Sequence, residues 1–252
     1  MNKFGKKILG VIPARYASTR FPGKPLIDIA GKSMIQRVYE RTIQSNLDAV
    51  VIATDHESII EHVKSFGATA ISTSENHPSG TDRCQEIAEK IGQDFDYIVN
   101  IQGDEPFIFP EQINLLIDIC DGKVELSTMM LEVKSHDLLM DDGEVKIVKD
   151  IDNQALYFSR QAIPAVKNKP IEEWLKYYTY YRHVGMYVYR KDILSQIAKL
   201  PPSSLEIAES LEQLRWLENG FKIKLVETNQ DSFCVDTPED VEWILEKFKH
   251  LL

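Results

Sequence analysis

Short apolar runs alternate with helical patterns in the first part of the chain. Runs rich in β-branched residues predict buried strands at 8–12, 49–53, 68–72 and 97–101. Between them, apolar residues recur at i, i+3 and i+4 spacing, which predicts three amphipathic helices. Their stripes are Met34/Ile35/Val38/Tyr39, Ile59/Ile60/Val63/Phe66 and Cys84/Ile87/Ala88/Ile91. This alternation favours βαβ units and an α/β fold with a mostly parallel sheet and helices on both faces.

The middle of the chain has a different pattern, with β-rich stretches at 126–133, 145–148, 155–159 and 184–189. We interpret residues 125–220, approximately, as a β-rich lobe added to the same sheet. The sequence has no internal repeat, low-complexity tract or linker. We therefore expect a single domain over residues 1–252.

The last part of the chain contains one predicted helix, one strand and a clear helix start. Apolar residues on one face predict a single helix over 204–219 that ends at Gly220. They are Leu205, Ala208, Leu211, Leu214 and Leu217. A strand at 221–226 follows. Thr237 as N-cap, Pro238 at the first helical position and Asp240 after them predict a further helix.

Composition restricts the classes of function. The chain has 252 residues, 43% hydrophobic and 27% charged, which is typical of globular proteins. A formal charge of −10 argues against broad nucleic-acid binding, because such proteins need a basic face to neutralise phosphates. An anionic substrate would therefore require a local basic pocket.

Two features indicate a cytoplasmic protein without a membrane segment. The apolar run after the N-terminus ends at Pro13 and is too short for a signal peptide or a membrane span. The three cysteines, Cys84, Cys120 and Cys234, are widely spaced, which fits buried, reduced thiols.

The loop after the first strand is the main candidate for phosphate binding, since ligands of parallel sheets bind at the carboxyl ends of the strands. Within 13–25 it carries Arg15, Arg20 and Lys24, it contains Gly23, and prolines limit its flexibility. Neither GxxxxGK[ST] nor GxGxxG occurs. A stiff cationic loop suits a triphosphate, although a solvated basic loop is an equally open interpretation.

Two carboxylates are candidate ligands of one Mg²⁺. Asp104 directly follows the strand at 97–101, and Asp236 lies between an apolar strand region and the capped helix. Mg²⁺ prefers one or two protein carboxylates together with phosphate oxygens and water. Taken alone, Asp104 also fits a turn residue and Asp236 a helix cap.

Several other polar residues are ambiguous on local evidence. Ser79 to Arg83 opens the third helix, where it could bind an anion or serve as a plain capping segment. His183 lies beside an apolar run, where a histidine is more often structural than catalytic. Arg160 follows a strand, and Glu212 and Gln213 fall on the polar side of the predicted helix.

Eight motifs in order give these residues a common meaning. They are 12–26 (IPARYASTRFPGKPL), 53–55 (ATD), 79–83 (SGTDR), 100–106 (NIQGDEP), 155–160 (ALYFSR), 182–185 (RHVG), 211–215 (LEQLR) and 235–240 (VDTPED). The set spans nearly the whole chain and closely resembles the 3-deoxy-D-manno-octulosonate (Kdo) cytidylyltransferases.

The resemblance implies a Rossmann-like nucleotidyltransferase fold with a β-rich dimerisation lobe, a homodimer, and the conversion of CTP and Kdo to CMP-Kdo and pyrophosphate. By motif, Arg15 and Lys24 would contact the triphosphate and, with Asp104 and Asp236, form the catalytic set; the two aspartates would bind Mg²⁺. The residues implied for nucleotide binding are Pro13, Ala14, Arg15, Lys24, Ser79, Gly80 and Arg83. Those implied for the sugar acid are Gln102, Arg160, His183, Tyr187, Glu212 and Gln213, with Arg160 pairing with the Kdo carboxylate.

One segment departs from the family pattern. Where the family carries Pro-Asn-x-Val-Lys, this chain has Asp142-Gly143-Glu144-Val145-Lys146. Residues 137–146 therefore receive no assigned contact, and an amino-substituted octulosonate or a sialic-acid-like sugar is an alternative substrate. A non-catalytic nucleotide-sugar-binding subunit is a further alternative, which the joint presence of Arg15, Lys24, Asp104 and Asp236 disfavours.

Overall fold

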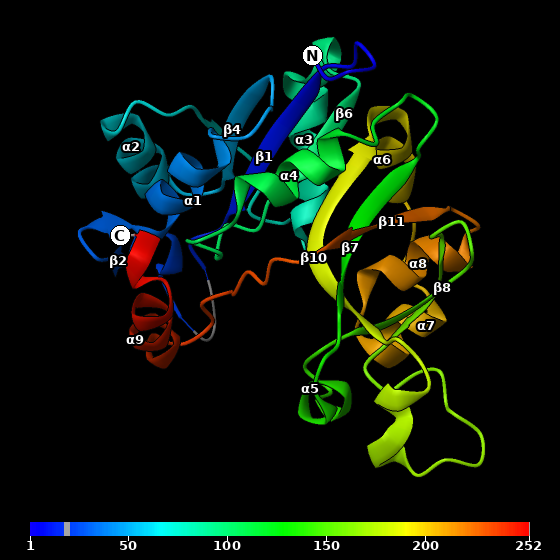
Figure 1. Cartoon of the computed structure of the whole chain (residues 1–252). Coiled ribbons are helices and arrows are strands. Elements are labelled where there is room, and N and C mark those ends of the chain that lie inside the picture. The colour runs from blue at the N-terminus through cyan, green and yellow to red at the C-terminus, as the bar shows by residue number, and fades with distance from the viewer. Residues whose placement is uncertain (18–20, 252) are drawn as a thin grey trace. The chain divides into compact units, whose positions relative to one another are not determined.

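The computed structural model describes residues 1–17 and 21–251 (Figure 1). The chain forms two compact units. The first contains residues 1–123, 186–198 and 232–252, and the second contains 124–185 and 199–231. Strand β10 (Tyr181–Arg190) contributes residues to both. The expectation of a single domain over the whole chain stays a prediction.

The first unit is built on a mostly parallel sheet in the order β10-β6-β1-β4-β5. Strand β1 (Ile8–Ala14) pairs in parallel with β4 (Ala49–Thr54) and with β6 (Tyr97–Asn100), and β5 (Ala70–Ser72) pairs in parallel with β4. Within the described part of this sheet, β10 runs antiparallel to β6. The apolar residues of β1 are fully buried, as expected of a parallel strand that is covered on both faces.

The strand order places the helices of the first unit on both faces of its sheet. The chain moves outward from β1 to β4 and β5, then returns to place β6 on the other side of β1. Right-handed crossovers put α1 and α2 on one face and α3 on the other. The helices are α1 (Met34–Thr42), α2 (Glu57–Ser65), α3 (Gly80–Lys90), α4 (Pro110–Ile117), α6 (Lys191–Ile197) and α9 (Pro238–Lys247). Shorter elements are η1 (Lys24–Leu26), β2 (Asp28–Ile29), β3 (Lys32–Ser33), η2 (Gly92–Asp94) and η4 (Lys249–Leu251).

A hydrophobic cluster joins the C-terminal segment to the early part of the first unit. Buried Met34 and Phe107 pack with Val235, Ile244 and Phe248, which come from the segment before α9 and from the helix end. The Phe107 and Phe248 rings stack with centroids 5.0 Å apart. This packing fixes the chain on either side of Asp236.

The second unit contains short strands and short helices. Strand β7 (Leu126–Glu132) pairs in parallel with β11 (Ile223–Thr228), and β8 (Lys146–Lys149) is antiparallel to β9 (Ala155–Ser159) and to the start of β10. The remaining elements are α5 (His136–Met140), η3 (Ile171–Lys176), α7 (Ser204–Glu209) and α8 (Glu212–Glu218). The β-rich character expected for the middle of the chain is confirmed, while its role in dimerisation stays a prediction.

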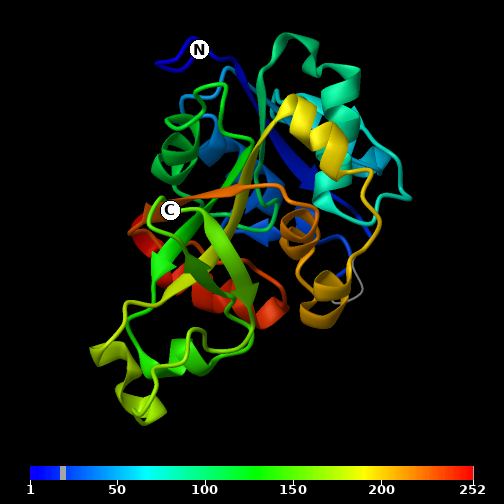
Figure 2. The same ribbon diagram turned by 90° about the vertical axis from the view of Figure 1, so that its right-hand side faces the viewer.

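The prediction of one helix over 204–219 is wrong. The segment forms α7 and α8, which are separate coils in Figures 1 and 2. Ser210, between them, lies in the left-handed region with φ 54° and ψ 47°. The apolar spacing misled because Ala208 is exposed, whereas Gln213, expected on the polar face, is buried.

Other differences are smaller. The last strand covers 223–228 rather than 221–226, and β5 begins at residue 70 rather than 68. The apolar patterns did not predict α4, α5 and α6. Cys84 and Cys120 are buried as expected, but Cys234 is exposed.

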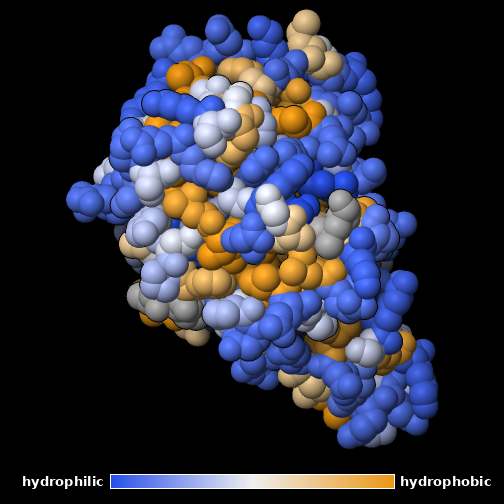
Figure 3. All heavy atoms as spheres, turned by 90° about the vertical axis from the view of Figure 1, so that its left-hand side faces the viewer, coloured by the Kyte–Doolittle hydropathy of each residue, from blue (hydrophilic) through white to orange (hydrophobic). Residues whose placement is uncertain are grey.

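On the face that Figure 3 shows, hydrophilic residues cover most of the surface and hydrophobic ones gather near its middle. Exposed apolar side chains of this kind are common on folded proteins and by themselves indicate no partner. Within residues 1–17 and 21–251, we find no helix with the length and hydrophobicity that a membrane span requires.

Candidate active site

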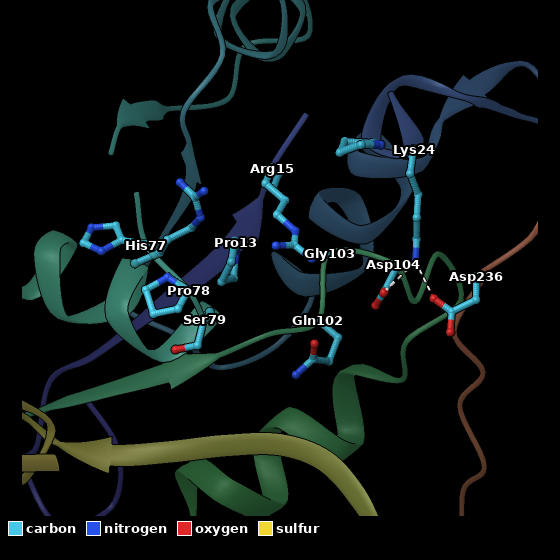
Figure 4. A pocket seen from close by; sticks show the side chains of 14 residues that line it. Pro13, Arg15, Lys24, His77, Pro78, Ser79, Gln102, Gly103, Asp104 and Asp236 are labelled. Carbon is cyan, nitrogen blue, oxygen red and sulfur yellow. Dashed lines mark hydrogen bonds and ion pairs between the residues drawn. The ribbon is translucent and has the colours of Figure 1, made fainter. Parts of the chain in front are cut away.

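A pocket of about 260 Å³ lies in the first unit, at the carboxyl ends of β1 and β6 (Figure 4). The strand order reverses between these two strands, and such a switch point is the expected ligand crevice of a parallel sheet. The predicted residues that line the pocket are Pro13, Ala14, Arg15, Lys24, Ser79, Gly80, Arg83, Gln102, Asp104 and Asp236. His77, Pro78, Pro25 and Gly103 line it as well. The sequence therefore identified most of one pocket from loops that are far apart in the chain.

The loop after β1 is held at both of its described ends. The Tyr16 backbone N–H donates to Asp55 (3.3 Å), and the Tyr16 ring stacks on His56 with centroids 4.0 Å apart. Gly23, at φ 69°, donates its N–H to the Tyr16 carbonyl (3.2 Å) and is the N-cap of η1. A left-handed φ at this point requires glycine or strains any other residue. Arg20, one of the predicted cations, lies outside the described residues.

Lys24 and the two candidate metal ligands form one charged cluster. The Lys24 Nζ lies 2.8 Å from the Asp104 Oδ2 and 3.0 Å from the Asp236 Oδ1, and Figure 4 shows both carboxylates converging on it. The Lys24 side chain is only 13% exposed. Burial by itself would lower the pKa of Lys24, but the charges and hydrogen bonds of Asp104 and Asp236 outweigh it and raise the pKa.

Backbone contacts explain why these two aspartates meet. The Val235 N–H donates to the Asp104 carbonyl (2.9 Å), and Val235 is buried in the cluster with Phe107. The segment before Asp236 is not a strand, contrary to expectation, so this bond and this packing hold it instead. Asp236 is not the cap of α9, because Thr237 takes that place with Asp240 in a capping box.

The carboxylates of Asp104 and Asp236 suit a divalent cation. They approach one point from two separate segments and are about one third exposed, at 31% and 35%. Mg²⁺ commonly binds to one or two carboxylates and completes its shell with phosphate oxygens and water. Groups of three or more histidine, cysteine, aspartate or glutamate side chains that could hold a metal ion do not occur among the described residues.

The start of α3 forms another wall of the pocket. Ser79 is the N-cap, and its hydroxyl accepts the Asp82 N–H (3.2 Å). Arg83 is buried and donates to Asp55 (2.5 Å) and to the Thr73 hydroxyl (2.7 Å). Arg83 thus lines the pocket with its guanidinium held by these two acceptors.

Asp55 and His77 are site residues to which sequence reasoning gave no role. Asp55 joins the Tyr16 backbone to Arg83, and its place in the 53–55 motif was the available signal. His77 lines the pocket and hydrogen bonds to Glu86 through Nε2. Glu86 also accepts the Ser74 N–H and pairs with Lys90. Although burial opposes it, these partners lower the pKa of Glu86 to about 2.

The residues expected to bind the sugar acid fall in both units. Gln102 lines the pocket of the first unit, and Tyr187 lies opposite Asn100 where β10 pairs with β6. Arg160, His183, Glu212 and Gln213 belong to the second unit. Within it, the His183 Nε2 hydrogen bonds to the Thr128 hydroxyl (2.8 Å) and the His183 ring packs edge-on against Phe158. Burial and the Arg182 charge lower the pKa of His183 to about 3.

Comparison with known proteins identifies the family. The model of the cytidylyltransferase family matches residues 9–224. A 3-deoxy-manno-octulosonate cytidylyltransferase from Parabacteroides distasonis is 52% identical over 242 residues, which cover 94% of this chain and 96% of the relative. The chain belongs to the 3-deoxy-manno-octulosonate cytidylyltransferase family. The family member from Geobacter sulfurreducens is 48% identical, with 96% and 99% of the two chains covered.

A solved structure agrees with this family assignment. It is a CMP:2-keto-3-deoxy-manno-octonic acid synthetase complexed with CTP, and it matches this cytidylyltransferase with a TM-score of 0.91 and 40% identity. The match covers 98% of this chain and 100% of that chain. The predicted family and the predicted α/β fold of a nucleotidyltransferase are thus confirmed.

Proposed function

We propose that this chain transfers CMP from CTP to Kdo, giving CMP-Kdo and pyrophosphate for lipopolysaccharide synthesis. The observation that carries the proposal is the convergence of Lys24, Asp104 and Asp236 in one pocket. The pocket lies where the strand order of the sheet reverses, between β1 and β6, in a chain of the cytidylyltransferase family. An acidic chain with a charge of −10 needs such a local concentration of cations and metal ligands to bind a triphosphate.

The chemistry required is an in-line displacement. The anomeric hydroxyl of Kdo forms a bond to the α-phosphorus of CTP, and the bond from that phosphorus to the departing pyrophosphate oxygen breaks. Two anions must be brought together, and charge on the transition state must be neutralised. Arg15, which points into the pocket in Figure 4, and Lys24 supply positive charge. No covalent intermediate with the protein is needed.

The remaining residues would bind the metal ion, the cytidine or the sugar acid. Asp104 and Asp236 would hold Mg²⁺, which would neutralise charge on the triphosphate and the leaving pyrophosphate. Pro13, Ala14, Ser79 and Gly80 line the pocket beside Arg83 and would accommodate the cytidine. Arg160 would pair with the sugar carboxylate, since a guanidinium fork matches a carboxylate in geometry.

The substrate is tested by incubating the protein with CTP, Mg²⁺ and one sugar acid at a time, and by measuring pyrophosphate and the CMP-sugar. Kdo, an amino-substituted Kdo and a sialic acid should be compared at equal concentration. We expect the highest kcat/KM with Kdo. Absence of pyrophosphate with Kdo, or a higher kcat/KM with another acid, would reject Kdo as the substrate.

We further propose a cytoplasmic, Mg²⁺-dependent homodimer that associates through the β-rich lobe. Light scattering after size-exclusion chromatography should give twice the chain mass of 28.9 kDa. Chelation of divalent cations should abolish turnover, and added Mg²⁺ should restore it. Fractionation of the source cells should find the protein with cytoplasmic markers.

A further inference from the structure

Glu209 of the second unit holds both the backbone and the side chain of Arg160. The Arg160 N–H donates to the Glu209 Oε2 (2.9 Å), and the Arg160 Nε donates to the Glu209 carbonyl oxygen (2.8 Å). One residue therefore fixes Arg160 at two points, one on each side of its Cα. Long arginine side chains normally keep considerable rotamer freedom, which these contacts remove.

The second carboxylate oxygen of Glu209 ties the same site to strand β9. Its Oε1 accepts the Ser159 hydroxyl (2.7 Å) and lies 3.5 Å from the Tyr157 hydroxyl. Ser159 in turn accepts the Gln161 N–H (3.0 Å). The carboxylate is thus embedded in the end of β9, where Arg160 leaves the strand.

The break between α7 and α8 makes the Glu209 carbonyl available. The last carbonyls of a helix have no partner within the helix, and a basic side chain can satisfy them. Helix α7 ends at Glu209 because Ser210 adopts the left-handed conformation. In an uninterrupted helix over 204–219, the Glu209 carbonyl would instead accept a backbone N–H one turn later.

The remaining donors of Arg160 suit a carboxylate ligand. A guanidinium has five N–H donors. The Nε donates to Glu209, and the Nη1 donates one hydrogen to the Asp142 carbonyl (3.0 Å). Among the described residues, these two carbonyl oxygens are the acceptors that the Arg160 side chain contacts. Three of its five N–H donors, on Nη1 and Nη2, therefore remain for a ligand. The end of the guanidinium that carries Nη1 and Nη2 is the edge that binds a carboxylate in a fork.

We propose that Glu209 is a positioning residue that presents Arg160 to the carboxylate of the sugar acid. The inference rests on the proposed function, in which Arg160 pairs with that carboxylate. Glu209 fixes the arginine before the substrate arrives, so binding does not have to order it.

The central test is Glu209→Ala. The change removes the carboxylate that holds the Arg160 backbone N–H at the end of β9, and it leaves the guanidinium only its bonds to the main-chain carbonyls of Glu209 and Asp142. We expect the KM for Kdo to rise by about tenfold, because the arginine is then less firmly oriented, while kcat and the KM for CTP change by less than about twofold. Glu209→Gln should recover most of the affinity. Its amide oxygen can still accept the Arg160 N–H, and its amide nitrogen can donate to the Ser159 hydroxyl.

Glu206→Ala is the matched control on the same helix. Glu206 forms a capping box with Ser203 and pairs with Arg215 (2.7 and 2.5 Å). Its loss should lower the thermal stability as much as Glu209→Ala does or more, yet leave the KM for Kdo unchanged. If it raised the KM for Kdo equally, the effect of Glu209 would be general destabilisation, and the positioning role would be rejected.

A second measurement tests whether Glu209 acts through the carboxylate of the sugar acid. Binding of Kdo and of Kdo methyl ester should be compared by calorimetry in the presence of a non-hydrolysable CTP analogue and Mg²⁺. Glu209→Ala should weaken Kdo binding by about tenfold and ester binding by less than about twofold. Equal weakening of both ligands would overturn the proposal.

The outcomes separate the two hypotheses. If the wild-type protein forms no CMP-Kdo, the proposed function fails and the role of Glu209 fails with it. If the wild-type protein is active with Kdo and Glu209→Ala retains the wild-type KM, only the positioning role is rejected.

Discussion

Backbone topology brings the pocket residues of the first unit together, whereas side-chain hydrogen bonds hold Arg160 in the second unit. Arg15 follows β1 and Asp104 follows β6, two neighbouring parallel strands, and Ser79 is the N-cap of α3. Arg160 depends on Glu209, which is available because a helix breaks at Ser210. Sites of the first kind are set by strand order, and sites of the second kind by individual local conformations.

The largest effect should come from neutralising a carboxylate of the proposed metal site. Asp104→Asn or Asp236→Asn should lower kcat by about 100-fold to 1,000-fold, because charge on the transition state is no longer neutralised. Pyrophosphate release at saturating CTP, Kdo and Mg²⁺ measures this loss. Glu239→Gln, an exposed change in the first turn of α9, should leave kcat unchanged. A kcat near the wild-type value in either aspartate variant would refute the metal assignment.

The next effect concerns the buried ion pair of Arg83 with Asp55 at the pocket wall. Asp55→Asn should lower the free energy of unfolding by about 3 kcal/mol, because it leaves Arg83, 3% exposed, without its charged partner. Asp192→Asn is the contrasting control, since the Arg190–Asp192 pair is largely exposed and should contribute less than about 1 kcal/mol. Urea denaturation compares the two, and equal losses would mean that burial of the Asp55–Arg83 pair does not matter.

A smaller loss is expected where the loop after β6 touches the end of β1. A Cβ added at Gly103 would lie 2.4 Å from the Pro13 carbonyl oxygen, so the backbone would have to move. Gly103→Ala should therefore cost about 1–3 kcal/mol of stability. A Cβ at Gly185 would meet no heavy atom of the described residues within 4 Å, and Gly185→Ala should be tolerated. Similar thermal unfolding midpoints for Gly103→Ala and Gly185→Ala would contradict the expected steric clash at Gly103.

The smallest effect should be a pH dependence located in the second unit. The pKa of His183 is about 3 in the folded chain against an ordinary 6.5, so the unfolded chain takes up the proton first as the pH falls. The stability that neutral His183 contributes is complete above pH 6.5 and is lost progressively towards pH 3.

Because His183 keeps part of its surface accessible to water, the loss should be modest. Between pH 7 and pH 5, the wild-type protein should lose about 1 kcal/mol more than His183→Gln. Urea denaturation at both pH values measures it. Parallel stability curves would show that His183 does not titrate differently on folding.

The sequence predicted the first unit better than the second for a physical reason. Strands such as 8–12 and 97–101 are mostly apolar runs in a sheet covered on both faces, so their ends and following loops are visible in the pattern. The single helix expected over 204–219 failed because one left-handed residue, Ser210, outweighs a regular apolar spacing. Serine carries little signal for that conformation.

Contacts between side chains were the least predictable part of the site. The bond of Lys24 to both Asp104 and Asp236, and the engagement of Arg83 by Asp55, depend on three-dimensional packing between distant segments. Resemblance to a family supplied the candidate residues. Which of them face the pocket and which support its wall is visible only from the fold.

The position of Asp236 in the chain has a consequence for synthesis on the ribosome. Its bond to Lys24 spans 212 residues, and the preceding Val235 is buried in one cluster with Phe107. The whole second unit is translated between these partners. A nascent chain that has not yet released residues 232–248 from the ribosome therefore lacks Asp236, so the cluster of Lys24, Asp104 and Asp236 forms only after the second unit has been translated.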